Sequence, residues 1–177
     1  SLEEKQAAAA IGQIQLMSFY RDLFKKLKID VAQILLSAAD CNTRKRYVNA
    51  QNTIETLIKN GVIPIINEND TITVGAIKIG DNDRLAARVA QMISADLMIL
   101  FSDIDGLYDK NPKVDKSAKL IREVTSITEK IKNMAGDSVS SVGTGGMITK
   151  IMAAKMLENS GCETIITNGT EDNTLKQ

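Results

Sequence analysis

The chain alternates between long segments with apolar residues at helical spacing and short segments that are almost wholly apolar. Apolar positions over residues 2–27 predict one long helix. Residues 31–37 (VAQILLS) are a short apolar run between polar residues, which is typical of a strand. Residues 44–60 predict a second helix that Gly61 would end, and VIPIIN at 62–67 predicts a second strand.

The same alternation continues in the second half. We expect a helix at 83–94, a strand at 97–102, a helix at 147–159 and a strand at 164–167, whereas residues 109–141 are polar and turn-rich. Strands that are apolar throughout and joined by connections of about a dozen residues or more favour a parallel sheet covered on both faces. The sequence therefore predicts the α/β class, as a three-layer αβα sandwich with a mainly parallel central sheet.

Composition narrows the range of partners. The 177 residues suit one domain, and the 22 basic residues cancel the 22 acidic ones, which removes the electrostatic argument for nucleic acid or an anionic membrane. There is no Trp, and three Phe and three Tyr offer few surfaces for stacking bases. The longest apolar runs, such as 62–66, are far shorter than the roughly 20 residues of a membrane helix. We expect neither nucleic acid nor membrane as a partner.

Histidine is absent from the sequence, and this limits the chemistry. Ser-His-Asp hydrolysis, Cys-His proteolysis and His-ligated zinc are excluded within this polypeptide. Cys41 and Cys162 form no Cys-x-x-Cys pair, so we expect two reduced, partly buried thiols in a cytoplasmic protein. Catalysis would have to use Lys, Arg, Asp, backbone dipoles and a bound ion.

The segment from Gly143 to Lys150, GTGGMITK, opens the predicted helix at 147–159. Its glycines allow close backbone approach, and the helix that follows offers free N–H groups and a positive dipole end, so the pattern favours phosphate binding. It is not a Walker A loop, because three residues separate the glycine from the lysine. The alternatives are a flexible loop with a capping glycine and a solvated helix lysine.

Polar clusters follow the predicted strands. NEND ends the strand at 62–67, SDIDG the strand at 97–102, and TNGTED the last strand. In open α/β sheets ligands bind beyond the carboxyl ends of the strands, so we expect these loops to converge on one edge. GDND precedes the helix at 83–94, where Asp81 or Asp83 could be a cap, although a cap needs only one acid. SDIDG could be an ordinary turn, and it lacks the glutamate of a calcium-binding loop.

With these motifs in order, the chain resembles the glutamate 5-kinases of the amino acid kinase superfamily over nearly its whole length. PIINENDT, IKIGDNDRLAARVA and AGDSVSSVGTGGMITK carry the resemblance. It implies transfer of the γ-phosphoryl group of Mg-ATP to the γ-carboxylate of L-glutamate, which forms glutamyl 5-phosphate on the way to proline. Because a carboxylate is already a nucleophile, this reaction needs gathered positive charge and alignment more than a general base.

The resemblance also implies roles for individual residues. Lys150 would stabilise charge on the moving phosphoryl group, and Asp83 would hold catalytic lysines in position. The implied glutamate contacts are Asp70 and Asn82, with Asn67 and Asp81 as further candidates. The implied nucleotide contacts are Ser102, Asp103, Thr144, Gly145, Gly146, Met147, Ile148, Thr149 and Lys150. Mg²⁺ would bridge phosphate oxygens, and no protein residue is assigned to it.

The sequence departs from the family pattern in three respects. The family begins with a strand and a glycine loop whose lysine contacts ATP, followed by a loop with a substrate-binding serine, and neither occurs here. We therefore expect residues 1–177 to be a partial amino acid kinase domain, without a C-terminal RNA-modification-type domain. The segment TITVGAIKI between the acidic clusters is expected to be a hairpin or lid, and Ala76 replaces an acid common in the family.

The sequence is compatible with several alternatives. The chain could belong to a kinase for aspartate, N-acetylglutamate or carbamate, although NEND with GDND argues against this. The same module also occurs fused to a reductase in pyrroline-carboxylate synthases. A non-catalytic regulatory or assembly module is the alternative from another class. The family further implies a homo-oligomer, dimer or tetramer, and feedback inhibition by proline.

Overall fold

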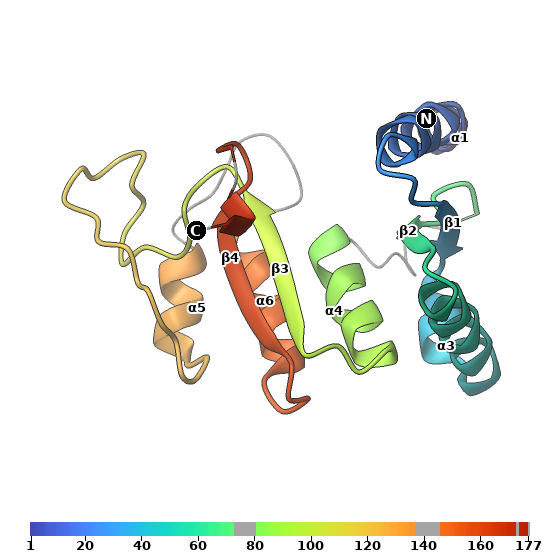
Figure 1. The fold of residues 1–177 in the computed structure, drawn as a ribbon. Helices are drawn as coiled ribbons and strands as arrows, with labels where there is room; N and C mark the ends of the chain where they lie inside the picture. Colours follow the sequence, from blue (N-terminus) through green and yellow to red (C-terminus); the bar gives the residue numbers. More distant parts are fainter. Residues whose placement is uncertain (73–80, 137–145, 173, 177) are drawn as a thin grey trace. The chain divides into compact units, whose positions relative to one another are not determined.

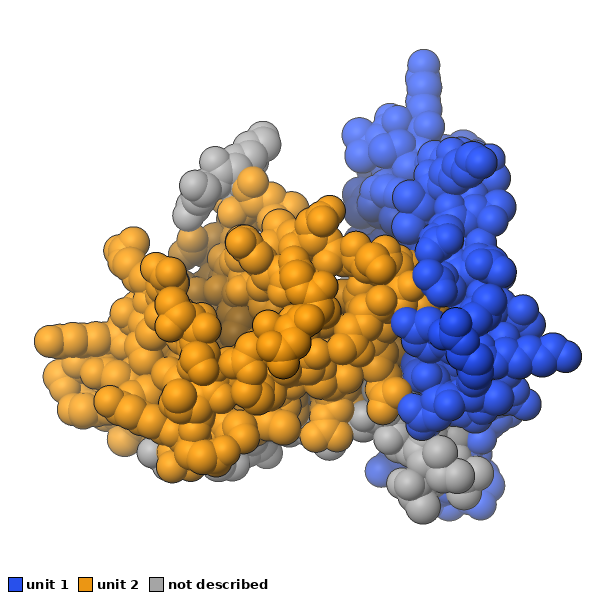
Figure 2. All heavy atoms as spheres, turned by 90° about the horizontal axis from the view of Figure 1, so that it is seen from below, with its two compact units in different colours: residues 1–79 blue, residues 80–177 orange. Residues whose placement is uncertain are grey.

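The computed structural model describes residues 1–72, 81–136, 146–172 and 174–176. The chain divides into two compact units, residues 1–79 and residues 80–177, each of which is described by itself (Figures 1 and 2). Unit 1 contains α1 (Leu2–Lys25), β1 (Val31–Leu36), α2 (Ala38–Asn42), α3 (Arg44–Lys59) and β2 (Ile63–Glu68). Unit 2 contains α4 (Asn82–Met92), β3 (Leu97–Ser102), α5 (Glu129–Gly136), α6 (Met147–Leu157), β4 (Glu163–Asn168) and the 3-10 turn η2 (Thr174–Lys176).

Unit 1 is built on a parallel strand pair. β1 pairs with β2 from Val31 opposite Ile63 to Leu36 opposite Glu68. Helix α3 connects the two strands and buries Ile54 completely. Gly61 follows this helix with φ of 74°, a left-handed conformation that glycine adopts at little cost, so the predicted stop signal is confirmed.

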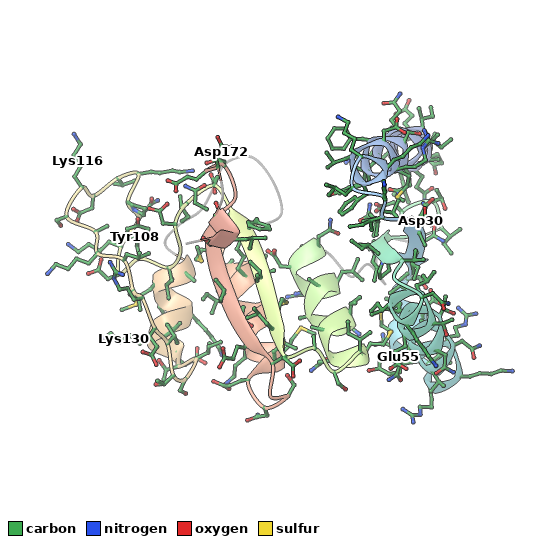
Figure 3. All side chains as sticks on the ribbon, in the orientation of Figure 1. Asp30, Glu55, Tyr108, Lys116, Lys130 and Asp172 are labelled. Carbon is green, nitrogen blue, oxygen red and sulfur yellow. The ribbon has the colours of Figure 1, made fainter. Side chains whose placement is uncertain are left out.

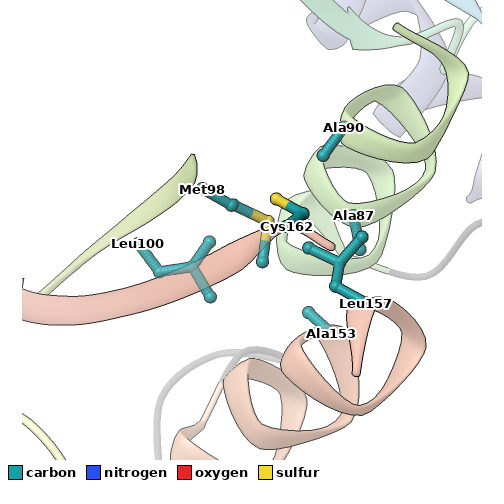
Figure 4. Packing of buried hydrophobic residues seen from close by; sticks show 7 residues of the cluster. All are labelled: Ala87, Ala90, Met98, Leu100, Ala153, Leu157 and Cys162. Carbon is teal, nitrogen blue, oxygen red and sulfur yellow. The ribbon is translucent and has the colours of Figure 1, made fainter. Parts of the chain in front are cut away.

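Unit 2 repeats the arrangement with β3 and β4, which are also parallel. Helix α4 packs against α6, and both contribute to a core beside the strands (Figure 4). The buried members of this core are Ala87, Ala90, Met98, Leu100, Ala153, Leu157 and Cys162. Its alanines leave little side-chain bulk between the two helices, so their backbones can approach closely.

A second core lies under the long segment that follows β3. Leu107, Ala135, Met147 and Ile151 are buried together there. Tyr108 lies in this segment (Figure 3). An isolated antiparallel bridge between Tyr108 and Leu120 closes its first part, and the Tyr108 hydroxyl donates a hydrogen bond to Asp105 Oδ2 at 3.1 Å. The loop is therefore packed against α5 and α6 by its own apolar residues.

The α/β class is confirmed, and every strand pair in the described residues is parallel. The predicted helices and strands are all present, with ends that differ by at most two residues. Helices α2 and α5 were not predicted. Helix α2 has five residues, too few for a periodic pattern, and it depends on a capping box between Ser37 and Asp40.

The expected hairpin or lid, TITVGAIKI, lies largely outside the described residues. Within the described chain, no helix is long and apolar enough to cross a membrane.

Candidate active site

The loops after β3 and β4 meet at the carboxyl edge of their sheet. The Gly169 amide donates to the Ser102 carbonyl oxygen at 2.9 Å, and Asn168 Nδ2 donates to Asp105 Oδ1 at 3.0 Å. The convergence predicted for SDIDG and TNGTED is thus confirmed. NEND ends β2 in unit 1, where the Asn69 amide donates to the Leu36 carbonyl oxygen at 2.9 Å.

Gly169 allows the loop after β4 to lie close to the end of β3. A Cβ atom on Gly169 would lie 2.8 Å from the Cβ of Phe101, which is closer than two carbon atoms can approach. The clash is with an atom fixed to the β3 backbone, so a rotamer change of Phe101 cannot relieve it. Glycine at position 169 therefore keeps the loop after β4 against the end of β3.

Asp83 and Lys150 form the most buried of the ion pairs between described residues. Lys150 Nζ lies 3.0 Å from Asp83 Oδ1 and 3.1 Å from Oδ2, and each side chain retains 13% of its exposure. Asp83 comes from the first turn of α4 and Lys150 from the first turn of α6. The packing of these two helices therefore fixes the position of the lysine ammonium.

Thr149 makes a second contact with the Asp83 carboxylate. Its hydroxyl oxygen lies 2.6 Å from Asp83 Oδ2 and 2.7 Å from the Gly146 carbonyl oxygen. A hydroxyl has one proton, so it donates to one of these acceptors at a time, and the charged carboxylate is the stronger acceptor. The sequence expected Thr149 as a nucleotide contact, whereas its side chain here is directed to Asp83.

Among the described residues, no side chain caps the start of α6. Gly146 occupies the N-cap position without a capping hydrogen bond, whereas Asp81 Oδ1 accepts from the Arg84 amide at 2.8 Å to cap α4. Free N–H groups and the positive end of the helix dipole suit an anion. Met147 can offer only its backbone there, because its side chain is buried, while Ile148 is 36% exposed. Thr144 and Gly145 lie outside the described residues.

Ser102 and Asp103 lie at the end of β3, as the sequence predicted. Asp103 is exposed and its Oδ2 accepts from Lys113 Nζ at 2.9 Å, while Ser102 Oγ is 3.5 Å from Asp103 Oδ1. The hydrogen bond from Lys113, followed by one from the backbone amide of Asp103, lowers the pKa of the Asp103 carboxyl. Lys113 could not be predicted from the sequence, because its pairing with Asp103 depends on how the loop between the two residues folds.

Asn67 and Asp70 lie at the end of β2 in unit 1. Asn67 Nδ2 donates to Gln13 Oε1 at 3.2 Å, and Asn67 Oδ1 accepts from the Glu68 amide at 2.9 Å. Gln13 reaches this loop from α1, and its Nε2 is buried with no partner among the described atoms. The sequence missed Gln13 because only its position on the inner face of a helix brings it to the strand end. Asn82 and Asp81 begin α4, in unit 2, and Asn82 is exposed.

Unit 2 also contains a cavity of about 700 Å³ beside β4. Its walls mix apolar side chains, such as Leu107 and Ile151, with charged ones, such as Arg122 and Glu158. None of the site residues predicted from the sequence lines it, so this cavity is not the centre of the candidate site. The described residues contain no group of three acidic or other metal-binding side chains.

Comparisons with known proteins agree with this arrangement. The model of the amino acid kinase family matches residues 1–168. The chain is 53% identical over 175 residues to a glutamate 5-kinase of Paramagnetospirillum magneticum, covering 99% of this chain and 47% of that protein. It is 51% identical to the glutamate 5-kinase of Pelagibacter ubique, covering 99% and 48%, and 50% identical to that of Clostridium acetobutylicum, covering 99% and 66%.

The chain thus spans about half the length of most of the curated relatives it matches. Among solved structures, carbamate kinase from Giardia lamblia bound to AMP-PNP has a TM-score of 0.51 and 19% identity, covering 71% of this chain and 41% of that chain. At this identity the likeness supports the fold alone.

Proposed function

The chain belongs to the amino acid kinase family, and we propose that it serves the ATP-dependent phosphorylation of the γ-carboxylate of L-glutamate. The product would be glutamyl 5-phosphate, made in the first step of proline biosynthesis. The observation that carries the proposal is the Lys150 ammonium held by Asp83 at the uncapped start of α6, in a chain about half identical to glutamate 5-kinases.

Charge is the main obstacle in this reaction. The attacking carboxylate and the nucleotide phosphates are all anionic, so the site must neutralise and align them. Lys150 supplies a full positive charge next to the α6 N-terminus, which supplies N–H donors and a partial positive charge. Asp83 and Thr149 restrict where the ammonium can go, so it meets the transferring phosphoryl group in a fixed geometry.

Magnesium is proposed to reach the site with the nucleotide. It usually binds through one or two carboxylates and the phosphate oxygens of the substrate, so it does not need a dedicated cage of protein ligands. Bound in this way it would neutralise phosphate charge during transfer. Asp103 is an exposed carboxylate at the β3 end and, with Ser102, is proposed to contact the nucleotide.

We propose that the two acidic clusters, NEND and GDND, bind glutamate. Asp70 and Asn82 would contact the substrate, with Asn67 and Asp81 as further candidates. Two of these residues already serve the fold: Asp81 caps α4, and Asn67 binds Gln13. Substitution of Asp81 or Asn67 should therefore reduce stability as well as binding, whereas substitution of the exposed Asn82 should affect binding alone.

The first experiment measures ADP release by the purified chain with Mg-ATP, with and without L-glutamate. Aspartate and N-acetylglutamate serve as rival acceptors. Lys150→Ala should abolish the release, and Lys155→Ala is the matched control, because Lys155 is on the same helix but pairs with Glu158. Release that requires glutamate and Lys150 would support the proposal.

A second readout separates an inactive chain from a wrong assignment. Binding of Mg-ATP can be followed by calorimetry in the same variants. If Mg-ATP binds and Lys150→Ala weakens the binding, but no acceptor is phosphorylated, the chain would be a nucleotide-binding or regulatory module of the same fold. If it neither binds nor hydrolyses the nucleotide while folded, the assignment of α6 to nucleotide phosphates would be wrong.

A further inference from the structure

Helix α1, which packs against β1, carries a polar residue at the centre of its inner face. Apart from Ser18, its half-buried residues follow one another at intervals of three or four, which places them on one face of the helix. They are Gln6, Ala9, Gln13, Met17, Tyr20 and Phe24. Gln13 lies between Ala9 and Met17, where an apolar side chain would pack well. A buried amide costs free energy unless hydrogen bonds satisfy it, so the contacts of Gln13 are informative.

A chain of hydrogen bonds fixes the orientation of the Gln13 amide. The Glu68 backbone amide donates to Asn67 Oδ1 at 2.9 Å, so the other end of the Asn67 amide is the donor Nδ2. Asn67 Nδ2 donates to Gln13 Oε1 at 3.2 Å. Because each bond determines which amide atom is oxygen and which is nitrogen, Gln13 turns its Nε2 away from Asn67. The chain therefore begins at the β2 backbone and ends in the two N–H groups of Gln13.

Gln13 Nε2 ends this chain without an acceptor among the described residues. The atom is buried, and it is the only buried side-chain nitrogen or oxygen in the described part of the protein that has no hydrogen-bond partner there. A buried donor left unpaired carries its full desolvation cost, and native structures contain few such groups. A ligand that presents an acceptor oxygen at this position would remove the cost.

The chemistry of the β2 end favours a carboxylate as that ligand group. Under the proposed function the ligand is glutamate, and its α-ammonium is assigned to Asp70, three residues after Asn67. The α-carboxylate is attached to the same carbon atom, so it enters the same segment. Two acidic side chains lie there, the buried Glu68 and Asp70, so a carboxylate needs hydrogen-bond donors beside it. The γ-carboxylate has to stay available as the nucleophile.

We propose that Gln13 Nε2 donates to the α-carboxylate of the acceptor amino acid and is a specificity-determining residue of the site. The inference rests on the proposed function and adds to it a residue from α1, a helix that none of the assigned glutamate contacts comes from. Asn67 would then act on the substrate through Gln13, because its Nδ2 holds Oε1 and so directs Nε2 outward. A site built in this way prefers an α-amino acid to an amine that lacks the α-carboxylate.

NMR titration of the chain with L-glutamate and with γ-aminobutyrate, which is glutamate without its α-carboxylate, tests the contact. Gln13→Met keeps the length of the side chain and removes the amide. We expect it to weaken glutamate binding about 10- to 100-fold and to leave γ-aminobutyrate binding within about twofold. Gln15→Met is the matched control on the exposed side of the same helix, and it should leave both affinities within about twofold. The side-chain amide signal of Gln13, identified by its loss in Gln13→Met, should shift with glutamate.

Gln13→Glu separates a direct contact with substrate from support of Asn67. The ionised side chain still accepts from Asn67 Nδ2 but has no N–H to donate. We expect it to bind glutamate at least as weakly as Gln13→Met does. Glutamate binding at the level of the unchanged chain in Gln13→Glu, or equal weakening of both ligands in Gln13→Met, would overturn the inference while the proposed function stands. A folded chain that binds no glutamate would overturn the proposed function, and this inference with it.

Discussion

The Asp83–Lys150 pair gives the sharpest test of how the site is built. Replacing Asp83 by Ala removes both carboxylate contacts to Lys150 Nζ, at 3.0 and 3.1 Å, and the contact to the Thr149 hydroxyl at 2.6 Å. The lysine side chain, 13% exposed in the intact pair, then has no opposite charge in contact among the described residues. The protein therefore loses charge-assisted hydrogen bonds and keeps the desolvation cost of the lysine.

The magnitude follows from the burial. Breaking a fully buried ion pair from one side costs about 3–5 kcal/mol, and an exposed pair contributes about 0–1 kcal/mol. Because both side chains keep a little exposure, water can partly solvate the remaining ammonium, and we expect Asp83→Ala to cost about 2–3 kcal/mol. Lys150→Met keeps the aliphatic stem and leaves Asp83 bonded to Thr149, so it should cost about 1–2 kcal/mol.

The assay is urea denaturation of the two single variants and the double variant at neutral pH. If the pair acts as a unit, the double variant loses less than the sum of the single losses, with a coupling of about 1–2 kcal/mol. A loss below about 0.5 kcal/mol for Asp83→Ala, together with additive single losses, would show that the pair behaves like a surface ion pair. Asp83 could not then be the residue that positions Lys150.

Three further outcomes follow from local geometry. Gly169→Ala should destabilise the chain by about 1–3 kcal/mol through its clash at β3, whereas Gly136→Ala, with open space at its Cβ position, should be neutral or slightly stabilising in the same melts. Burial raises the pKa of the Cys162 thiol, so iodoacetamide should alkylate it only in denaturant; mass spectrometry showing rapid labelling of the folded chain would contradict this. Lys113→Ala should raise the pKa of Asp103 toward its ordinary value in an NMR titration, because the lysine hydrogen bond favours the carboxylate. A lowered folded pKa contributes stability above the unfolded value, and this small contribution should disappear as the pH falls through the folded value.

Much of the fold could be predicted because each strand and each long helix has a pattern of apolar residues that is visible in its own segment of the sequence. VAQILLS and VIPIIN are apolar runs, and Gly61 stops α3 for a reason visible in one residue. Helix α5 was missed although Ile131, Met134 and Ala135 follow helical spacing, because the polar residues around them indicated turns. In a helix as short as α5, too few apolar residues repeat at helical spacing to outweigh the turn-forming residues around them.

The contacts between the candidate site residues could be predicted only in part from the sequence. Motif resemblance pointed to Lys150 and Asp83, and the structure brings them together. The direction of the Thr149 hydroxyl and the approach of Gln13 to Asn67 could not be inferred, because each joins residues more than fifty positions apart in the sequence. Such contacts exist only once helix packing has set the distances.

The missing cap at Gly146 links folding to ligand concentration. If an anion binds at the start of α6, where no described side chain provides a cap, it would complete the helix, and its free energy of binding would be added to the stability of unit 2. The first turn of α6, which carries Lys150, would then be least ordered when the nucleotide is scarce and most ordered when it is abundant. If the proposed nucleotide binds there, its supply in a cell would set how long the folded chain survives.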